Sequence, residues 1–315
     1  MKVNPIASIG FSAGHLNGSF SNLQHFLDRL VAAGAGHCEL YITELDVVSG
    51  GRLIPERLRR FREICRARPL GYTFHLPLVS NLTEPERSSL DDSVLSALIE
   101  VAAAIDAAVL VLHPGRMPAG LAPSNRDALL ALERQQLWNL AERAASIGAC
   151  ISLENPPPSR DVLAGKVDPH GLNPSDIFSQ VKQTAHPNLN ATLDYSHAWI
   201  AAAHCKFDFL EAVRIVAPVV GHLHIHDSHG RPPHEPPTRF SDEVAYGVYD
   251  LHLPIGWGNV PFDKAISAMS IAPGTRVTIE LLERFWDELE GTLAVVRSLC
   301  RSFPEVEQQR LRGAA

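Results

Sequence analysis

Short apolar runs alternate with longer segments of helical periodicity along the whole chain. In the longer segments, apolar side chains recur every three or four positions, which is typical of amphipathic helices. The short runs predict eight strands, at Ile6–Phe11, His37–Ile42, Leu70–His75, Val109–His113, Ala149–Glu154, Leu189–Asp194, Val219–His226 and Arg276–Leu281. Strict alternation of near-continuous apolar strands with helices is typical of a parallel sheet, and eight such units close into a single (β/α)8, or TIM, barrel.

The predicted barrel domain covers residues 1–304, followed by a charged C-terminal tail at 305–315. Three connections that follow strands are longer than helix packing requires: the proline-rich stretch 155–173, the stretch 227–259 with two Pro-Pro pairs, and the stretch 80–88. In a barrel, the connections after the strands form the face on which active sites are built. We therefore expect long loops at the C-terminal face of the barrel.

Composition narrows the classes of partner. The chain has 315 residues, 45% apolar content and a net charge of −7, which argue for one sizeable core and against a broad basic surface for nucleic acid. A local basic groove or bound cations could offset the negative net charge where DNA would bind. DNA is therefore disfavoured as a partner but still possible. No apolar run is long enough for a signal peptide or a membrane span, and we expect a cytoplasmic protein. The five cysteines form no Cys-x-x-Cys pair, which argues against a thiolate zinc site, and the sequence specifies no oligomeric state.

Metal-binding side chains recur at the ends of successive predicted strands. They are His75, His113, Glu154, Asp194, His224 and Glu280. All strands of a parallel barrel end at the same face, so residues far apart in sequence converge there. Imidazole and carboxylate ligands together suit zinc, manganese, iron or cobalt.

Two local motifs add three further ligands. Asp194 is followed three positions later by His197, a spacing that spans one turn as the chain enters a helix. Asp250 and His252 form an Asp-x-His pair, which presents both side chains on one face of an extended segment. One catalytic zinc ion typically takes three protein ligands and a water, so nine ligands indicate more than one ion. We expect two or three divalent ions per chain, with zinc preferred and manganese, cobalt or iron as alternatives.

The same residues carry a resemblance to a known family. The matching fragments are Phe74-His75-Leu76-Pro77, His113-Pro114-Gly115, Leu153-Glu154-Asn155, Asp194-x-x-His197, His224-Ile225-His226-Asp227-Ser228, Asp250-x-His252 with Gly256-x-Gly258-Asn259, and Ile279-Glu280. This constellation resembles the xylose-isomerase-like barrel superfamily (AP endonuclease family 2), which contains endonuclease IV and the sugar phosphate isomerases and epimerases. It runs from the third predicted strand to the eighth.

The resemblance to endonuclease IV implies three metal positions. His75 and His113 would hold the first ion, and Glu154 would bridge the first and second. The rest of the set would be Asp194, His224 and Glu280 for the second ion, and His197, Asp250 and His252 for the third. No position of that set is missing from this chain.

The chain also departs from endonuclease IV. The loop after the first histidine offers Leu78 and Val79, with no aromatic residue to wedge into DNA. The proline run 155–158 and the long stretch 228–249 are foreign to the repair enzyme and would reshape the mouth of the pocket. These differences favour a small sugar-phosphate or nucleotide-like substrate.

The residues therefore predict a metal-dependent hydrolase that cleaves a phosphoester attached to a sugar or nucleotide-like group. The alternative is a metal-dependent sugar or sugar-phosphate isomerase or epimerase, in which Glu154 and Glu280 move protons on opposite faces of an enediolate. Both carboxylates are catalytic candidates in either mechanism. A third reading, a catalytically inert binding barrel, would predict the loss of a ligand, and none is lost.

Three further residues are candidates for substrate binding. Arg116 could meet a phosphate bidentately, although an exposed arginine at a helix entrance is an alternative. Trp257, between two glycines, could stack on a sugar or base or serve in packing. His226 shares a strand face with His222 and His224, so the ligand on this strand could shift by two positions.

Overall fold

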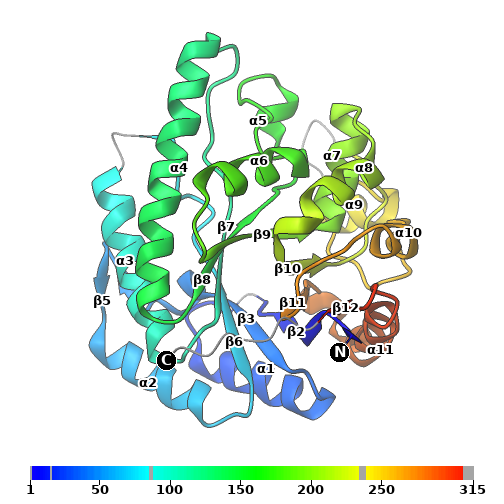
Figure 1. Ribbon diagram of the computed structural model, residues 1–315. Coiled ribbons are helices and arrows are strands. Elements are labelled where there is room, and N and C mark those ends of the chain that lie inside the picture. Colours follow the sequence, from blue (N-terminus) through cyan, green and yellow to red (C-terminus); the bar gives the residue numbers. More distant parts are fainter. Residues whose placement is uncertain (1, 15, 85–87, 234–238, 308–315) are drawn as a thin grey trace.

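The computed structural model describes residues 2–14, 16–84, 88–233 and 239–307. Within this part of the chain, eight parallel strands close into a barrel with helices around it (Figure 1). The strands are β2 (Ile6–Ser12), β3 (His37–Tyr41), β6 (Gly71–His75), β7 (Val109–Leu112), β8 (Cys150–Glu154), β9 (Leu189–Asp194), β10 (Val220–Ile225) and β11 (Thr275–Ile279). Each pairs with the next in this order, and β11 closes the barrel against β2. The predicted fold is confirmed, with all eight strands close to their expected positions.

The helices predicted between the strands are also present. They are α1 (Phe20–Ala33), α2 (Pro55–Arg66), α3 (Ser88–Ala104), α4 (Pro123–Ser146), α6 (Pro174–Thr184), α8 (Phe209–Val216), α10 (Phe262–Ser267) and α11 (Leu289–Cys300). In α1, the Ser19 hydroxyl caps the first turn by accepting from the amide of Asn22, and Gly34 ends the helix at a φ of 77°. Among the described helices, none combines the length and the apolar character needed to cross a membrane.

The long connections leave the carboxyl ends of the strands, as expected. The connection after β8 contains α5 (Arg160–Leu163), and the one after β10 contains α9 (Phe240–Tyr246). A further helix, α7 (Tyr195–Cys205), follows β9 without a loop. Because every strand pair of the barrel is parallel, these segments all gather at one rim of the barrel, which we call the carboxyl rim.

Two short sheets lie outside the barrel. One is the hairpin of β4 (Val48–Ser49) and β5 (Arg52–Leu53). The other pairs β1 (Lys2–Val3) with β12 (Val306–Glu307) in antiparallel register. The beginning of the predicted C-terminal tail is thus a strand, whereas residues 308–315 lie outside the described part of the chain.

Candidate metal centre

All nine predicted ligands lie together at the carboxyl rim. The described residues contain five overlapping groups in which the potential ligand atoms lie within 4.8 Å of one another. Two of them are Asp194, His197, His226 and Glu280, and Glu39, His222 and His224, while the other three together hold all nine predicted ligands. These three groups are His75, His113 and Glu154; Glu154, Asp194, His224 and Glu280; and His197, Asp250 and His252, the last joined by His226. Assignment of these residues as ligands remains a prediction, but the convergence on which it depends is present.

The first group is formed by residues from the ends of β6, β7 and β8. The Nε2 atoms of His75 and His113 lie 3.1 Å and 3.2 Å from the same oxygen of Glu154, Oε2. Ligands bonded to one tetrahedral zinc ion at about 2.0–2.1 Å lie roughly 3.3 Å from each other. These two distances therefore suit a common ion, and all three atoms lie within 4.8 Å of one another.

The second group lies deeper and holds three carboxylates around one imidazole. Nδ1 of His224 lies 3.0 Å from Glu154 Oε1 and 3.4 Å from Glu280 Oε1. Asp194 completes the group, and all four side chains are buried. Glu154 thus presents one oxygen to the first group and the other to the second.

The third group lies at the outer edge of the centre. Oδ2 of Asp250 lies 3.2 Å from Nε2 of His197 and 3.0 Å from Nε2 of His252. The backbone of His252 has a φ of 47°, which a residue with a side chain adopts only when its surroundings hold it there. The strained backbone turns this imidazole towards the group.

Backbone carbonyls orient three of the histidines. In each of them Nδ1 donates to a carbonyl: His75 to Leu76 at 2.8 Å, His197 to Asn155 at 3.0 Å, and His252 to Glu280 at 3.1 Å. A carbonyl oxygen can only accept, so each Nδ1 carries a proton. Each Nε2 then faces the carboxylates and is the ring nitrogen left for a metal ion, as in metal sites where the second ring nitrogen is held by a hydrogen bond.

Asn155 and Asp194 join the ends of neighbouring strands. The Asn155 amide donates to the carbonyl of Asp194 at 2.9 Å, and its oxygen accepts from the Asp194 amide at 3.0 Å. Asp194 is also the N-cap of α7, where it accepts from the amide of His197. The Asp-x-x-His spacing therefore has the expected geometry. Asp194 is the last residue of β9 and the N-cap of α7, and His197 follows in the first turn of the helix.

The electrostatics of the centre reflect opposite charges held close together. Burial disfavours the charged form of His224, but the carboxylates of Glu280, Glu154 and Glu39 outweigh it and raise its pKa well above the usual value. For His252, burial is likewise outweighed, mainly by Asp250, and the pKa rises to about 9. The carboxylates of the centre thus attract positive charge, which a divalent cation would supply in place of protons.

Unpartnered buried atoms give a further test of fit. The buried side-chain atoms that form no hydrogen bond within the described residues include His113 Nε2, which approaches Glu154 only at ion-pair distance, and Asp250 Oδ1. Burial also lowers the pKa of His113 despite the neighbouring Glu154, which favours the neutral imidazole that metal ions bind. Buried polar atoms without partners are uncommon in native proteins, and a cation would satisfy both. The donor set therefore fits divalent metal ions.

Two residues of β3 belong to the centre and were missed from the sequence. Glu39 is fully buried and lies 2.9 Å from Nε2 of His224, while the Tyr41 hydroxyl donates to Glu280 Oε1 at 3.1 Å. The Tyr41 ring also stacks on His75. A sequence signal for Glu39 was present, because a glutamate stands two positions after His37 in an otherwise apolar run. Alternate residues of a strand point to the same side, so Glu39 and Tyr41 share one face of β3.

The three predicted substrate contacts have different surroundings. The guanidinium of Arg116 is exposed and donates to the carbonyls of Leu78 and Val79. Trp257 is 49% exposed and packs edge-on against Phe285, apart from the three groups. His226 is buried inside the centre, 3.0 Å from Asp194 Oδ2 and stacked on His252. All three substrate roles remain predictions.

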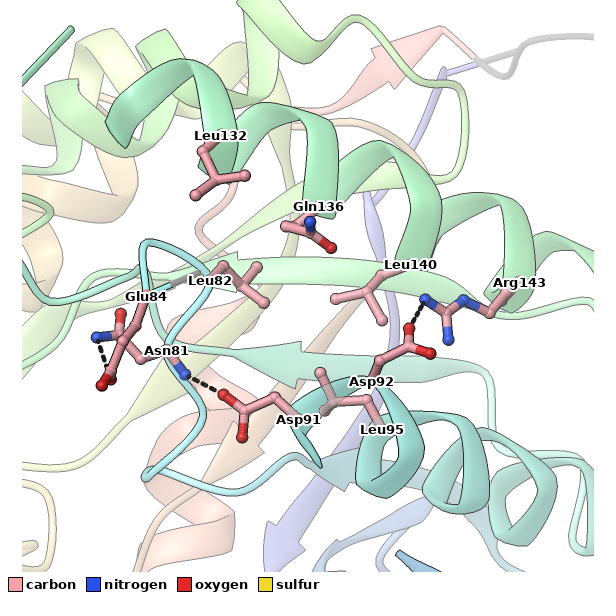
Figure 2. Close-up of a pocket in the computed structure, with 10 residues that line it drawn as sticks. All are labelled: Asn81, Leu82, Glu84, Asp91, Asp92, Leu95, Leu132, Gln136, Leu140 and Arg143. Carbon is pink, nitrogen blue, oxygen red and sulfur yellow. Dashed lines mark hydrogen bonds and ion pairs between the residues drawn. The ribbon is translucent and has the colours of Figure 1, made fainter. Parts of the chain in front are cut away.

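Access to the centre is limited to its edges. His113 and His252 have side chains that are 19% and 20% exposed, whereas those of the second group are almost fully covered. Cavities of ≈ 190 and ≈ 270 Å³ open beside these two histidines. Figure 2 shows a different pocket, of ≈ 100 Å³, between α3 and α4. There Asp92 pairs with Arg143, and none of the nine predicted ligands lines that pocket.

Comparison with known proteins identifies the family of this chain. The sequence pattern of the xylose isomerase-like TIM barrel family matches residues 27–300. The chain belongs to this family. One relative is the uncharacterised protein MJ1311 of Methanocaldococcus jannaschii. Its sequence is 27% identical to this chain over 221 residues. That match covers 69% of this chain and 66% of the relative, slightly less than two thirds of its length.

Solved structures of the xylose isomerase-like fold are similar over nearly their whole length. A D-tagatose 3-epimerase-like protein has a TM-score of 0.66 and 22% identity, covering 93% of this chain and 99% of its own. The TTHB071 protein of Thermus thermophilus, soaked with zinc chloride, has a TM-score of 0.61 and 21% identity, covering 95% and 100%. At such identities the likeness concerns the fold. The epimerase names nevertheless agree better with the predicted isomerase or epimerase alternative than with the predicted hydrolase.

Proposed function

We propose that the protein is a divalent-metal-dependent enzyme that hydrolyses a phosphoester attached to a sugar or nucleotide-like group. The observation that carries this proposal is that the potential ligands form several adjoining and overlapping groups, whereas a single-ion reaction needs one. Four residues suffice for one ion, so the first and third groups need another explanation. A multinuclear site for phosphoester chemistry provides it.

Divalent ions held by these residues would supply Lewis-acid chemistry, which activates water and balances the charge of a phosphoester. The protein side chains provide the arrangement. Glu154 connects the first and second groups through its two oxygens, and Tyr41 holds Glu280 by a hydrogen bond. The exposed edges of His113 and His252 are where a substrate reaches the centre.

A second function, isomerisation or epimerisation of a sugar, is supported by two observations. Solved structures with this fold include sugar epimerases. The second group also brings Glu154 and Glu280 close to the same nitrogen of His224, and two neighbouring carboxylates suit proton transfer. In that reaction the second group alone would hold the metal, and the third group would contact substrate.

Removal of the third group separates the two functions. We would replace both residues in Asp250→Asn/His252→Asn and compare hydrolysis of bis(p-nitrophenyl) phosphate with C3 epimerisation of D-tagatose. A multinuclear hydrolase should lose hydrolysis by about 10²-fold or more, a loss of the size seen when a catalytic charge stabiliser is removed. The double variant Asp263→Asn/His204→Asn makes the same chemical changes away from the centre and serves as the control.

Metal content provides an independent measurement. Two or three equivalents of metal in protein purified without added metal or chelator would support the hydrolase. Wild-type protein that epimerises D-tagatose with one equivalent, and retains this activity in the Asp250→Asn/His252→Asn variant, would overturn the hydrolase in favour of the epimerase.

A further inference from the structure

The cavity beside His113 has a mainly apolar wall, unlike the polar metal centre next to it. It is lined by segments that follow β6, β7 and β8, and its volume is ≈ 190 Å³. Much of the wall is apolar, including Leu78, Pro114, Pro156, Pro157, Val162 and Val167. The proline-rich connection after β8, which the metal centre itself does not use beyond Asn155, therefore forms a large part of this cavity.

The charged side chains in the wall already contact other protein groups. Asp168 forms an ion pair with Arg126 at 3.2 Å. His170 lies 2.9 Å from the buried carboxylate of Glu133. Arg116 lines the cavity as well, and its guanidinium donates to the carbonyls of Leu78 and Val79. Because Asp168 and His170 have partners of opposite charge and this guanidinium is held by two carbonyls, the cavity offers a mainly apolar wall to a further group of a ligand. It suits an uncharged one.

The size of the cavity narrows the class of ligand further. An apolar cavity of about 150 Å³ holds a benzene molecule. At ≈ 190 Å³, this cavity accommodates one ring or a small fused ring system. The flat faces of prolines and the methyl groups of valines pack well against a planar ring, which would shed its apolar surface from water on entering.

The cavity adjoins the metal centre at His113 and reaches the segment that carries Asp250. His113 belongs to the first ligand group and lines the cavity. Tyr249, which precedes the ligand candidate Asp250, lines it as well and has a φ of 69°. A group bound here would therefore lie next to whatever occupies the metal centre, so both could belong to one molecule.

We propose that this cavity, the ring pocket, binds an uncharged planar ring carried by the substrate. The inference rests on the proposed function, because it assigns the ring to the phosphoester that the metal centre cleaves. The substrate class is then a phosphoester whose sugar or alcohol portion bears an aromatic or heteroaromatic ring. Sugar phosphates without a ring would leave the pocket empty and bind more weakly.

A binding experiment tests the ring pocket without any metal-dependent reaction. Indole, an uncharged bicyclic ring, is titrated against the full-length protein by saturation-transfer difference NMR, with ribose as the ring-free probe. Val162→Trp fills the pocket from α5, and Ala164→Trp adds the same side chain just after α5, at a position that does not line the pocket, as the matched control. Val167→Trp fills the pocket from another point of the connection, in case Val162→Trp does not fold.

The expected result is millimolar binding of indole and none of ribose, with affinity at least about tenfold weaker in Val162→Trp and unchanged in Ala164→Trp. Indole that fails to bind the wild type, or that binds the filled and control variants equally, would overturn the ring pocket. Hydrolysis of bis(p-nitrophenyl) phosphate is measured in parallel. If indole binds as expected but no metal-dependent hydrolysis is found, the proposed function fails while the pocket stands.

Discussion

The Oε1 atom of Glu39 lies 2.9 Å from Nε2 of His224, at the centre of the barrel beneath the metal site. The other oxygen of Glu39 accepts from Thr73 at 2.8 Å and lies 2.8 Å from Nε2 of His222. His224 therefore faces a carboxylate with each ring nitrogen, Glu39 through Nε2 and Glu154 through Nδ1. Nδ1 of this ring points into the second ligand group.

We expect Glu39→Gln to weaken metal binding. A glutamine has nearly the same shape but lacks the charge that faces Nε2 of His224, and loss of such a partner typically costs about 10- to 100-fold in metal affinity. Competition with a chromogenic chelator measures this change. Glu133→Gln is the control, because Glu133 is an equally buried carboxylate that lies outside the barrel and pairs with His170. Equal metal affinity in both variants would contradict the role of Glu39.

His170 should make stability depend on pH. Burial disfavours its charged form, but the hydrogen bond and charge of Glu133 outweigh this and raise its pKa, with Asp176 also raising it and Arg126 opposing. Because the folded pKa lies above the unfolded value of about 6.5, the stabilisation is complete below that value and is lost as the pH rises through the folded pKa. His170→Gln keeps a neutral donor.

The difference in Tm between wild type and His170→Gln should therefore be largest below about pH 6 and should shrink as the pH rises above neutrality. Thermal unfolding across this range, in chelator so that metal binding does not contribute, provides the measurement. A difference that stays constant with pH would show that His170 is not charged in the folded protein.

Most of the fold and the predicted ligand set could be read from the sequence, because both depend on local patterns. An apolar run followed by His75 or Glu154 locates a strand and its end, and a parallel barrel brings all such ends together. Glu39 could not be found in this way. It meets His222, 183 positions away, inside the closed barrel, so its role depends on long-range packing that the strand pattern does not specify.

The position of Glu154 leads to the last prediction. Its Oε2 atom faces His75 and His113, and its Oε1 atom faces His224, so the two ligand groups depend on different oxygens of one carboxylate. In Glu154→Gln one oxygen is replaced by an NH₂ group, which has no lone pair for a metal. Whichever way the amide turns, one group loses its oxygen ligand. Metal content should therefore fall by at least one equivalent per chain, as measured by elemental analysis. Glu142→Gln, which changes an exposed carboxylate paired with His186, should keep the wild-type content. An unchanged content in Glu154→Gln would mean that this carboxylate does not bridge two ions, and the first group would then be a site for substrate rather than metal.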